Sequence, residues 1–335
     1  MNSSPAAHQY VPLTGGESAD ETLIADRAIN FLYSTAREQP SVLQRIAASK
    51  IATQALATWE FDLPLRRPIG TIATTAQRMG IDLSEVHGDL RQWRTLRNLF
   101  ERQIRYWQLR PMTEETRSII SPADGKALVF GYVDDFMLPV KSQWVAMPEL
   151  VGSQALADEL TPACGVIVRL TPEAYHYVHA PVSGIVRSHD LIDGALHSCN
   201  PTALVSFVKP YAMNLRRVTV IDTDVNYGSR VGVVVLVNVA AMMIGRIDDA
   251  YSPRRYDEPE PVSVGRFVRR GQPLALFRPG SSTSIALWTQ RRASVQSKLA
   301  KNGDRAGTQS RFSDWLLSPW VESAIRVRST LAVAC

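Results

Sequence analysis

The segment Val231-Gly-Val-Val-Val-Leu-Val-Asn-Val239 decides the fold class, because it is apolar at nearly every position. A half-buried strand alternates apolar and polar residues, whereas a strand covered on both faces reads as a continuous apolar run. The run continues to Gly245, but it contains Asn238 and is shorter than the ~20 residues that a membrane-spanning helix needs. The segment therefore predicts a strand that is buried on both faces of a sheet.

Further β-branched runs between turn residues surround this strand from Ile119 onward. We expect strands at 126–132, 165–170, 184–188, 204–208, 217–222, 262–269 and 283–287. Before this region, helical spacing follows Ser18-Ala-Asp-Glu21 and covers about 41–58, 70–79 and 93–107. The pattern predicts an α+β fold, with a loose arm over 1–20, a helical region over 21–115, a β-rich body over 116–290 and a basic tail over 291–335.

Composition excludes several classes of protein. With 335 residues, 45% of them hydrophobic and 21% charged, the chain suits a packed soluble protein rather than a disordered one. Its three scattered cysteines suit neither a disulfide framework nor a zinc cluster, so we expect no metal and a reduced, cytosol-facing protein. We find no signal peptide at the N-terminus and no nucleotide-binding glycine motif.

The net charge of +5 lies entirely within residues 281–335. A basic tail on a neutral body favours an anionic surface, either a membrane or a nucleic acid, although a solvated tail gives the same count. Aromatic residues among arginines make Trp93, Phe100, Tyr106 and Trp107 candidates for a membrane interface, together with Trp315 to Trp320. No other feature supports nucleic acid, so we expect no such partner.

Three segments carry candidate chemistry: a Pro/Gly turn with Asp124, a pair of histidines at His176 and His179, and the turn around Ser281. A serine nucleophile needs a base, and the base needs an orienting group, so Asp124, His179 and Ser281 form a candidate triad. Taken alone, each piece also fits a structural role, since turn carboxylates, core histidines and polar turns are common. Spacing does not decide between these readings.

The amino-acid sequences of these segments are more informative than the spacing between them. Ser121-Pro-Ala-Asp-Gly125, Leu170-Thr-Pro-Glu-Ala-Tyr-His-Tyr-Val-His-Ala-Pro-Val-Ser-Gly184 and Gly280-Ser-Ser282 resemble, in order, the ADG turn, the LSPxDYHRxHxPxxG segment and the GST/GSS site of the phosphatidylserine decarboxylase family. Supporting matches are Asn98 to Arg102, Arg110-Pro111, Cys199 to Pro201 and Asn214 to Val218. The resemblance covers about residues 25–290.

The resemblance implies a proenzyme that cuts itself between Gly280 and Ser281. Ser281 would attack the Gly280 carbonyl, His179 would take the hydroxyl proton, and Asp124 would orient His179. Elimination and hydrolysis would convert Ser281 into a covalent pyruvoyl cofactor, leaving a β chain (1–280) and an α chain (281–335). The pyruvoyl ketone would then form a Schiff base with the substrate amine, and His176 would handle protons during decarboxylation.

The implied substrate is phosphatidylserine, or a related amine that bears a carboxylate, and the implied product is phosphatidylethanolamine. We also expect a peripheral position on the cytoplasmic side of the cell membrane, partnership between the two cleaved chains, and a homodimer. Tyr177, Ala174 and Arg246 depart from the family pattern, as does the Arg-Pro-Gly turn that ends at Gly280. Because these departures bear on headgroup contacts, decarboxylation of a soluble aromatic amino acid is an alternative.

Two readings without catalysis stay open. His179-Ala-Pro-Val-Ser-Gly-Ile-Val186 and Val268-Arg-Arg-Gly-Gln-Pro-Leu-Ala-Leu-Phe277 resemble the two halves of a lipoyl-type hammerhead, which predicts hammerhead-like strands and a carrier or adaptor. That module needs a Met-Lys turn, which the sequence lacks. An unprocessed relative that only binds lipid is the other reading, and a serine hydrolase is disfavoured because no GxSxG surrounds Ser281.

Overall fold

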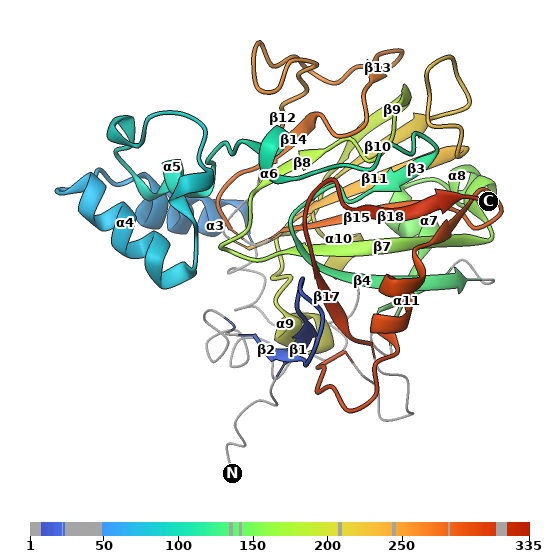
Figure 1. The fold of residues 1–335 in the computed structure, drawn as a ribbon, viewed down its shortest axis with the longest axis horizontal. Coiled ribbons are helices and arrows are strands. Elements are labelled where there is room, and N and C mark those ends of the chain that lie inside the picture. Colours follow the sequence, from blue (N-terminus) through green and yellow to red (C-terminus); the bar gives the residue numbers. More distant parts are fainter. Residues whose placement is uncertain are drawn as a thin grey trace.

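The structure is a computed structural model that describes residues 8–21, 23, 49–133, 137–140, 143–206, 210–242, 246–280, 282–312 and 320–335. The helical elements are α3 (Lys50–Ala57), η1 (Thr58–Asp62), α4 (Pro68–Met79), η2 (Leu83–Glu85), η3 (Leu90–Gln92), α5 (Leu96–Phe100), α6 (Tyr106–Leu109), α7 (Met147–Val151), α8 (Gln154–Leu160), α9 (Pro201–Ser206), α10 (Pro210–Met213) and α11 (Ser297–Gly303). Figure 1 shows α3, α4 and α5 to one side of the sheets.

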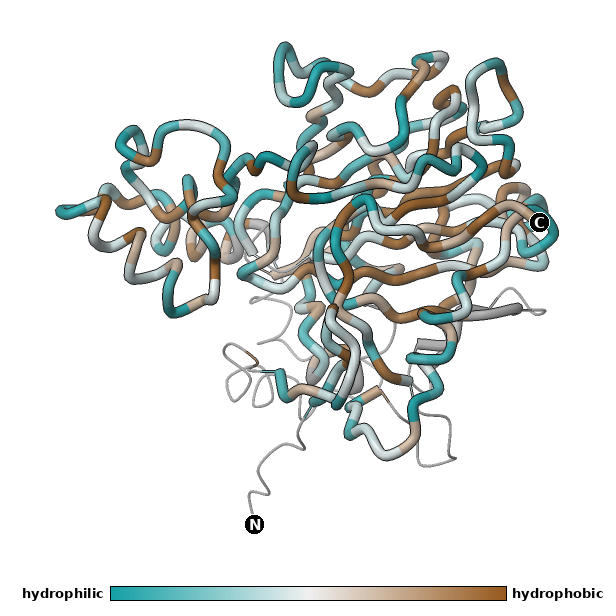
Figure 2. Tube along the Cα trace, in the orientation of Figure 1, coloured by the Kyte–Doolittle hydropathy of each residue, from teal (hydrophilic) through white to brown (hydrophobic). Residues whose placement is uncertain are grey.

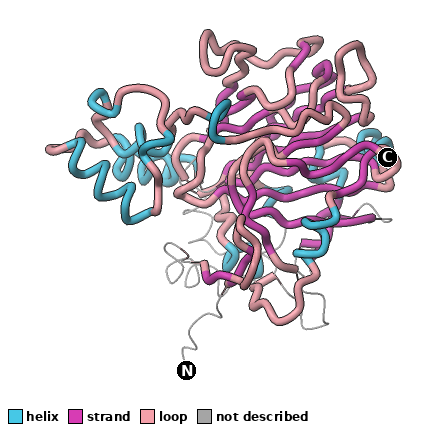
Figure 3. The backbone as a smooth tube through the Cα atoms, in the orientation of Figure 1, coloured by secondary structure: helices cyan, strands magenta, loops and turns pink. Residues whose placement is uncertain are grey.

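The strands are β1 (Gln9–Val11), β2 (Ala19–Asp20), β3 (Ser118–Ile120), β4 (Gly125–Val133), β5 (Met137–Val140), β6 (Gln143–Ala146), β7 (Ala163–Leu170), β8 (Tyr177–His179), β9 (Gly184–Ile192), β10 (Arg216–Asp222), β11 (Val233–Ala240), β12 (Ile247–Asp249), β13 (Phe267–Val268), β14 (Pro273–Phe277), β15 (Ser282–Thr289), β16 (Ala293–Val295), β17 (Glu322–Ile325) and β18 (Thr330–Ala334). They dominate the body of the molecule (Figure 3). The α+β class predicted from the sequence is confirmed.

The largest sheet has the order β13-β9-β10-β11-β15-β7-β4-β17-β1-β2. Its neighbours are antiparallel apart from the parallel pair β1 and β17. Two three-stranded sheets, β12-β14-β8 and β16-β18-β3, and the hairpin β5-β6 complete the described strands.

Strand β11 is covered on both faces, as its continuous apolar sequence predicts. Val234 and Leu236 pack into one hydrophobic core, whereas Val235 and Val237 pack into a second core. The brown, hydrophobic stretches in Figure 2 lie along these central strands. The two cores sandwich the sheet and fix the position of β15, the neighbour of β11.

Residues 204–208 were expected to form a strand, and this prediction is wrong for the described part. Residues Pro201–Ser206 form the short helix α9. Proline is favoured at the first helical position because it has no N–H to leave unpaired and its φ already suits a helix. Residues 204–206 therefore continue a helix that begins at Pro201, and they do not form a strand.

Both ends of the chain pack on the large sheet where they are described, although the sequence suggested a loose arm and a tail. β1 pairs with β17, and β17 pairs with β4. Buried charges join these strands: Arg169 bonds to Glu21 and Glu322 at 2.6 Å each, and His8 bonds to Glu322 at 2.9 Å. Burial opposes the charge on Glu322, but Arg169 and His8 outweigh it and lower its pKa to about 2.

Among the described residues, no helix has the length and apolar composition needed to cross a membrane. The expected helix that follows Ser18 and the first part of the helix expected at 41–58 lie outside the described residues, as do Trp315 and Ser281. The expected helix at 70–79 is found as α4, whose left-handed C-cap is Gly80.

Candidate active site

The two histidines are carried by one strand pair. β8 runs antiparallel to β14, with His179 opposite Pro273 and Tyr177 opposite Leu276. The Phe277 N–H donates to the His176 carbonyl at 3.1 Å. Because β14 leads directly to Gly280, this pairing ties the histidine segment to the predicted cleavage junction.

His179 is fully buried, and protein groups contact both of its ring nitrogens. Nδ1 lies 2.9 Å from the Gly271 carbonyl, which can only accept, so Nδ1 carries the proton. Nε2 lies 2.9 Å from the Tyr175 hydroxyl and accepts from it. Burial lowers the pKa of His179 to about 3, an effect to which the charges of Arg328 and Arg110 add. The imidazole is therefore neutral near pH 7, with its basic lone pair on Nε2.

A second tyrosine extends this hydrogen-bonded chain. The Tyr175 and Tyr256 hydroxyls are 2.7 Å apart, and the Tyr256 hydroxyl also contacts the Ile104 carbonyl at 2.9 Å. Since Tyr175 gives its single proton to His179, the proton of Tyr256 has two competing acceptors. Burial raises the pKa of Tyr256 and of Tyr175 well above the ordinary value, so both remain protonated.

His176 has a different environment. Its side chain is fully buried, and neither ring nitrogen has a hydrogen-bond partner among the described residues. The ring stacks on Phe100 with centroids 3.6 Å apart. Burial lowers its pKa well below the ordinary value, and the nearby charge of Arg102 adds to the effect. A buried polar group without a partner is costly, so this imidazole is a strong candidate for a functional role.

The sequence analysis predicted that Asp124 orients His179, but the two side chains are not in contact in the structure. Its carboxylate accepts from Arg110 Nη2 at 2.8 Å and from the Val327 backbone N–H at 2.7 Å. Nδ1 of His179 is already bonded to Gly271, so the histidine has no remaining proton to offer. The same turn nevertheless positions His179 through the backbone, because the His179 N–H donates to the Pro122 carbonyl at 2.7 Å.

The structure describes the predicted cleavage junction as far as Gly280. Gly280 has φ +138°, a backbone conformation that residues with a side chain rarely adopt. On its other side Ser282 begins β15, opposite Leu170 of β7 and Ala240 of β11. The buried Ser282 hydroxyl has no hydrogen-bond partner among the described residues. Ser281 lies outside them, so its contacts with the histidines are not described.

The strand register places His176 nearer to this junction than His179. Pro273, opposite His179, precedes Phe277 by four residues, which is about 13 Å of strand. The two histidines also face different surroundings. His176 stacks on Phe100, whereas His179 packs edge-on against Tyr106 at 4.6 Å.

Two arginines that depart from the expected pattern, Arg246 and Arg278, form ion pairs beside the junction. Asp248 pairs with both Arg246 and Arg278, and Arg278 also pairs with Glu101. The positive charge that Arg246 introduces is therefore balanced by carboxylates. Tyr177 stacks on Tyr175 at 5.4 Å and belongs to the aromatic cluster.

The sequence analysis gave no individual role to Tyr175, Tyr256, Gly271 or Arg110. Tyr175 and Arg110 lie within quoted motifs, which was a signal that they matter. Gly271 lies within the hammerhead-like segment Val268–Phe277, whereas Tyr256 lies outside every motif. Only the folded arrangement reveals their contacts with His179 and Tyr175.

A pair of buried, uncharged histidines on the strand beside a Gly–Ser junction is a site suited to proton transfer. The phosphatidylserine decarboxylase family model matches residues 96–307, a span that contains Asp124, both histidines and the junction. The chain is 32% identical to a phosphatidylserine decarboxylase proenzyme of Anaeromyxobacter sp. over 74% of its length and 88% of that relative. It is 25% identical to proenzymes of the same name from Ruminiclostridium cellulolyticum and Clostridium beijerinckii, over 83% and 82% of its length and 86% of each relative.

The chain belongs to the phosphatidylserine decarboxylase family. It is accordingly an enzyme, a carboxy-lyase, and the carrier and adaptor readings are set aside.

Proposed function

We propose that the chain is a proenzyme that cuts itself at Gly280–Ser281 and then decarboxylates phosphatidylserine to phosphatidylethanolamine. The observation that carries the proposal is the pairing of β14 with β8, which ties the junction to the strand of His176 and His179. The names of the relatives support both the self-processing and the substrate.

The cleavage chemistry balances without an outside oxidant. The Ser281 hydroxyl attacks the Gly280 carbonyl and gives its proton to a base, for which the neutral His179 is our candidate. The Gly280–Ser281 amide C–N bond then breaks, which leaves an ester and a free amine on residue 281. Loss of the α-proton of residue 281 expels Gly280 as a carboxylate and converts residue 281 into dehydroalanine. Its enamine tautomerises to an imine, which takes up one water and releases ammonia to leave a pyruvoyl group.

The residues around the junction fit such a group. Gly280 supplies a backbone conformation without a side chain, while His176 offers two buried ring nitrogens without partners among the described residues. The pyruvoyl ketone supplies an electron sink for the loss of carbon dioxide. His176 would hold a proton at one ring nitrogen and pass it to the substrate carbon. Tyr175 and Gly271 would keep His179 in a single tautomer.

Intact mass spectrometry of the purified wild-type chain tests this proposal. We expect two masses, for residues 1–280 and 281–335, with the second lighter by one ammonia than a peptide that begins with serine. A single mass that stays unchanged on incubation would contradict self-cleavage.

We further propose that the protein contacts an anionic membrane surface peripherally, on the cytoplasmic side. The support is the set of exposed apolar side chains between α3 and the start of α4, a region at the side of the molecule: Ile51, Leu56, Trp59, Leu63 and Ile69. Trp59 is 73% exposed and Ile51 is 85% exposed, and Arg66 and Arg67 are exposed next to Leu63. Aromatic, aliphatic and basic groups together suit a membrane interface.

This surface differs from the one expected from the sequence. Phe100 and Tyr106 were candidates for the interface, but both are buried and pack against the histidines. They therefore cannot insert into lipid without unfolding the site.

The double variant Trp59→Ser/Ile69→Ser should bind vesicles that contain phosphatidylserine at least tenfold more weakly in co-sedimentation. Each exposed side chain that enters the interface contributes about 1.5–3 kcal/mol, and 1.4 kcal/mol corresponds to tenfold in affinity. Tyr227→Asn/Val264→Ser is the matched control, because these side chains are also exposed but lie outside this set. Equal binding by the two double variants would contradict the assignment.

A further inference from the structure

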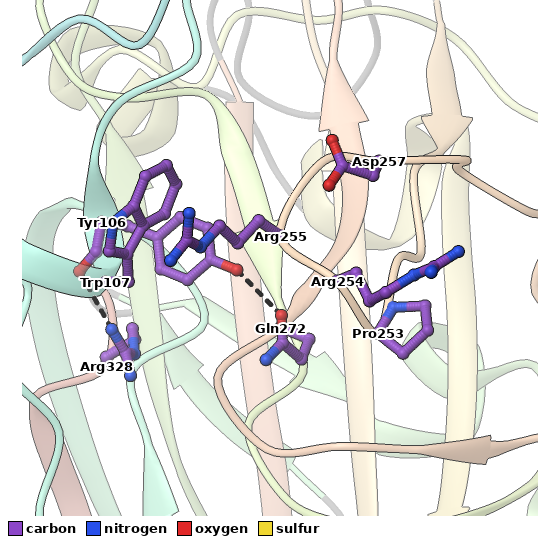
Figure 4. Close-up of a pocket in the computed structure, with 8 residues that line it drawn as sticks. All are labelled: Tyr106, Trp107, Pro253, Arg254, Arg255, Asp257, Gln272 and Arg328. Atoms are coloured by element: carbon purple, nitrogen blue, oxygen red, sulfur yellow. Dashed lines mark hydrogen bonds between the residues drawn. The ribbon is translucent and has the colours of Figure 1, made fainter.

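A cavity of about 420 Å³ opens beside the aromatic cluster and is not used by the chemistry described above. One wall is formed by Tyr106 and Trp107 of α6, and another by Arg254 and Arg255 after β12. Arg328, between β17 and β18, completes the basic lining (Figure 4). The Tyr106 ring also contacts His179, so the cavity shares a wall with the candidate active site.

Arg255 has no ion-pair or hydrogen-bond partner among the described residues. Its guanidinium lies over the Trp107 ring, 4.0 Å from the centroid, which orients the group without neutralising it. Its neighbour Arg254 differs, because it pairs with Glu258. Arg255 thus presents an uncompensated positive charge.

Arg328 is likewise unpaired with any carboxylate in the described part of the chain. Nη1 donates to the Tyr106 carbonyl at 2.9 Å, but Nε is buried and has no partner. A buried N–H without an acceptor carries a desolvation penalty. An anion in the cavity would relieve that penalty.

The backbone of both arginines is unusual. Arg255 has φ +64° and Arg328 has φ +72°, a left-handed conformation that is uncommon for residues other than glycine. Such conformations carry backbone strain, and Asn, which tolerates them, can replace either arginine without adding to it.

We propose that this cavity binds a phosphoryl group, as a phosphate ester or as the headgroup of an anionic phospholipid. A guanidinium offers parallel N–H groups that match two oxygens of a phosphate, and two such groups face the cavity. The volume lies within the range of small-molecule sites. The one carboxylate of the lining is Asp257, which Figure 4 draws on the other side of Arg255 from Arg328.

Calorimetric titration of the full protein with inorganic phosphate at constant ionic strength tests the proposal. We expect one saturable site in the wild type and binding at least tenfold weaker in Arg255→Asn. Asparagine tolerates the left-handed conformation, so the variant removes the charge without adding backbone strain. Arg230→Asn is the matched control, because Arg230 is exposed, has φ +56° and is not part of the cavity lining.

The outcomes separate clearly. Absence of saturable binding in the wild type, or equal weakening in the two variants, overturns the proposal. A second arm compares co-sedimentation of both variants with phosphatidylcholine vesicles that contain phosphatidylglycerol. A loss confined to Arg255→Asn identifies the lipid headgroup as the source of the phosphoryl group, whereas phosphate binding without a vesicle effect identifies a soluble phosphate ester. The readout is binding, so it does not depend on self-cleavage or decarboxylation.

Discussion

Replacing Ser281 by alanine is expected to leave the chain as one uncut polypeptide without a pyruvoyl group and without decarboxylase activity. Alanine has no hydroxyl, so the ester that precedes elimination cannot form. The backbone around Gly280 should be unchanged, because alanine is smaller than serine and follows the glycine whose conformation is special. Gel electrophoresis and intact mass measurement report the result directly.

Ser282→Ala provides the matched control for this experiment. Ser282 is the next residue, its hydroxyl is buried, and that hydroxyl has no partner among the described residues. The Ser282 variant should therefore fold and cut. Two chains from Ser281→Ala would show that another residue is the nucleophile and would refute the proposed cleavage site.

Replacing His176 by alanine should permit cleavage and yet reduce decarboxylation about a hundredfold or more. Positioned proton transfer contributes typically 10²–10⁴-fold to an enzymatic rate, and His176 holds two buried nitrogens without partners among the described residues. Cleavage is followed by mass, and decarboxylation is followed by release of carbon dioxide from phosphatidylserine vesicles.

His189→Ala is a suitable control, because His189 on β9 bonds to Thr219 of β10 and to Asp249 of β12 rather than to the groups around His176. Its removal should leave both reactions near the wild-type rate. A fully active His176 variant would refute the role proposed for this residue. A His176 variant that fails to cut would instead assign the residue to self-processing, in keeping with its position nearer the junction than His179.

The central strands could be predicted from the sequence because burial on two faces leaves a continuous apolar signature. Val233–Ala240 forms the strand that the run at 231–239 predicts, and the two cores on its faces give the reason. Residues 204–206 show the limit of this method. The run 204–208 was expected to form a strand, but the proline at position 201 favours a helical start, and local backbone geometry outweighs composition in so short a segment.

The members of the candidate site were easier to predict than their contacts. Asp124 and His179 were identified as residues, yet the bond between them is absent from the structure. The partner of Asp124 is Arg110, fourteen positions earlier, and the partner of His179 Nδ1 is a backbone carbonyl at Gly271. Any residue can supply a backbone carbonyl, so no sequence pattern marks this contact. The exposed apolar set that includes Trp59 was missed for a related reason, since exposure depends on what packs nearby.

The position of β15 has a consequence for the lifetime of the mature enzyme. Cleavage before Ser281 would leave β15 in the shorter chain, held between β11 and β7 of the longer one, and β17 likewise between β4 and β1. Such an interleaved sheet forms readily only while the chain is continuous, because the strands then reach one another at low entropic cost. The cut therefore makes folding a one-way event. Once a mature molecule unfolds, its two separate chains no longer refold readily into the same sheet. The lifetime of the folded enzyme is therefore set by its rate of unfolding rather than by its equilibrium stability.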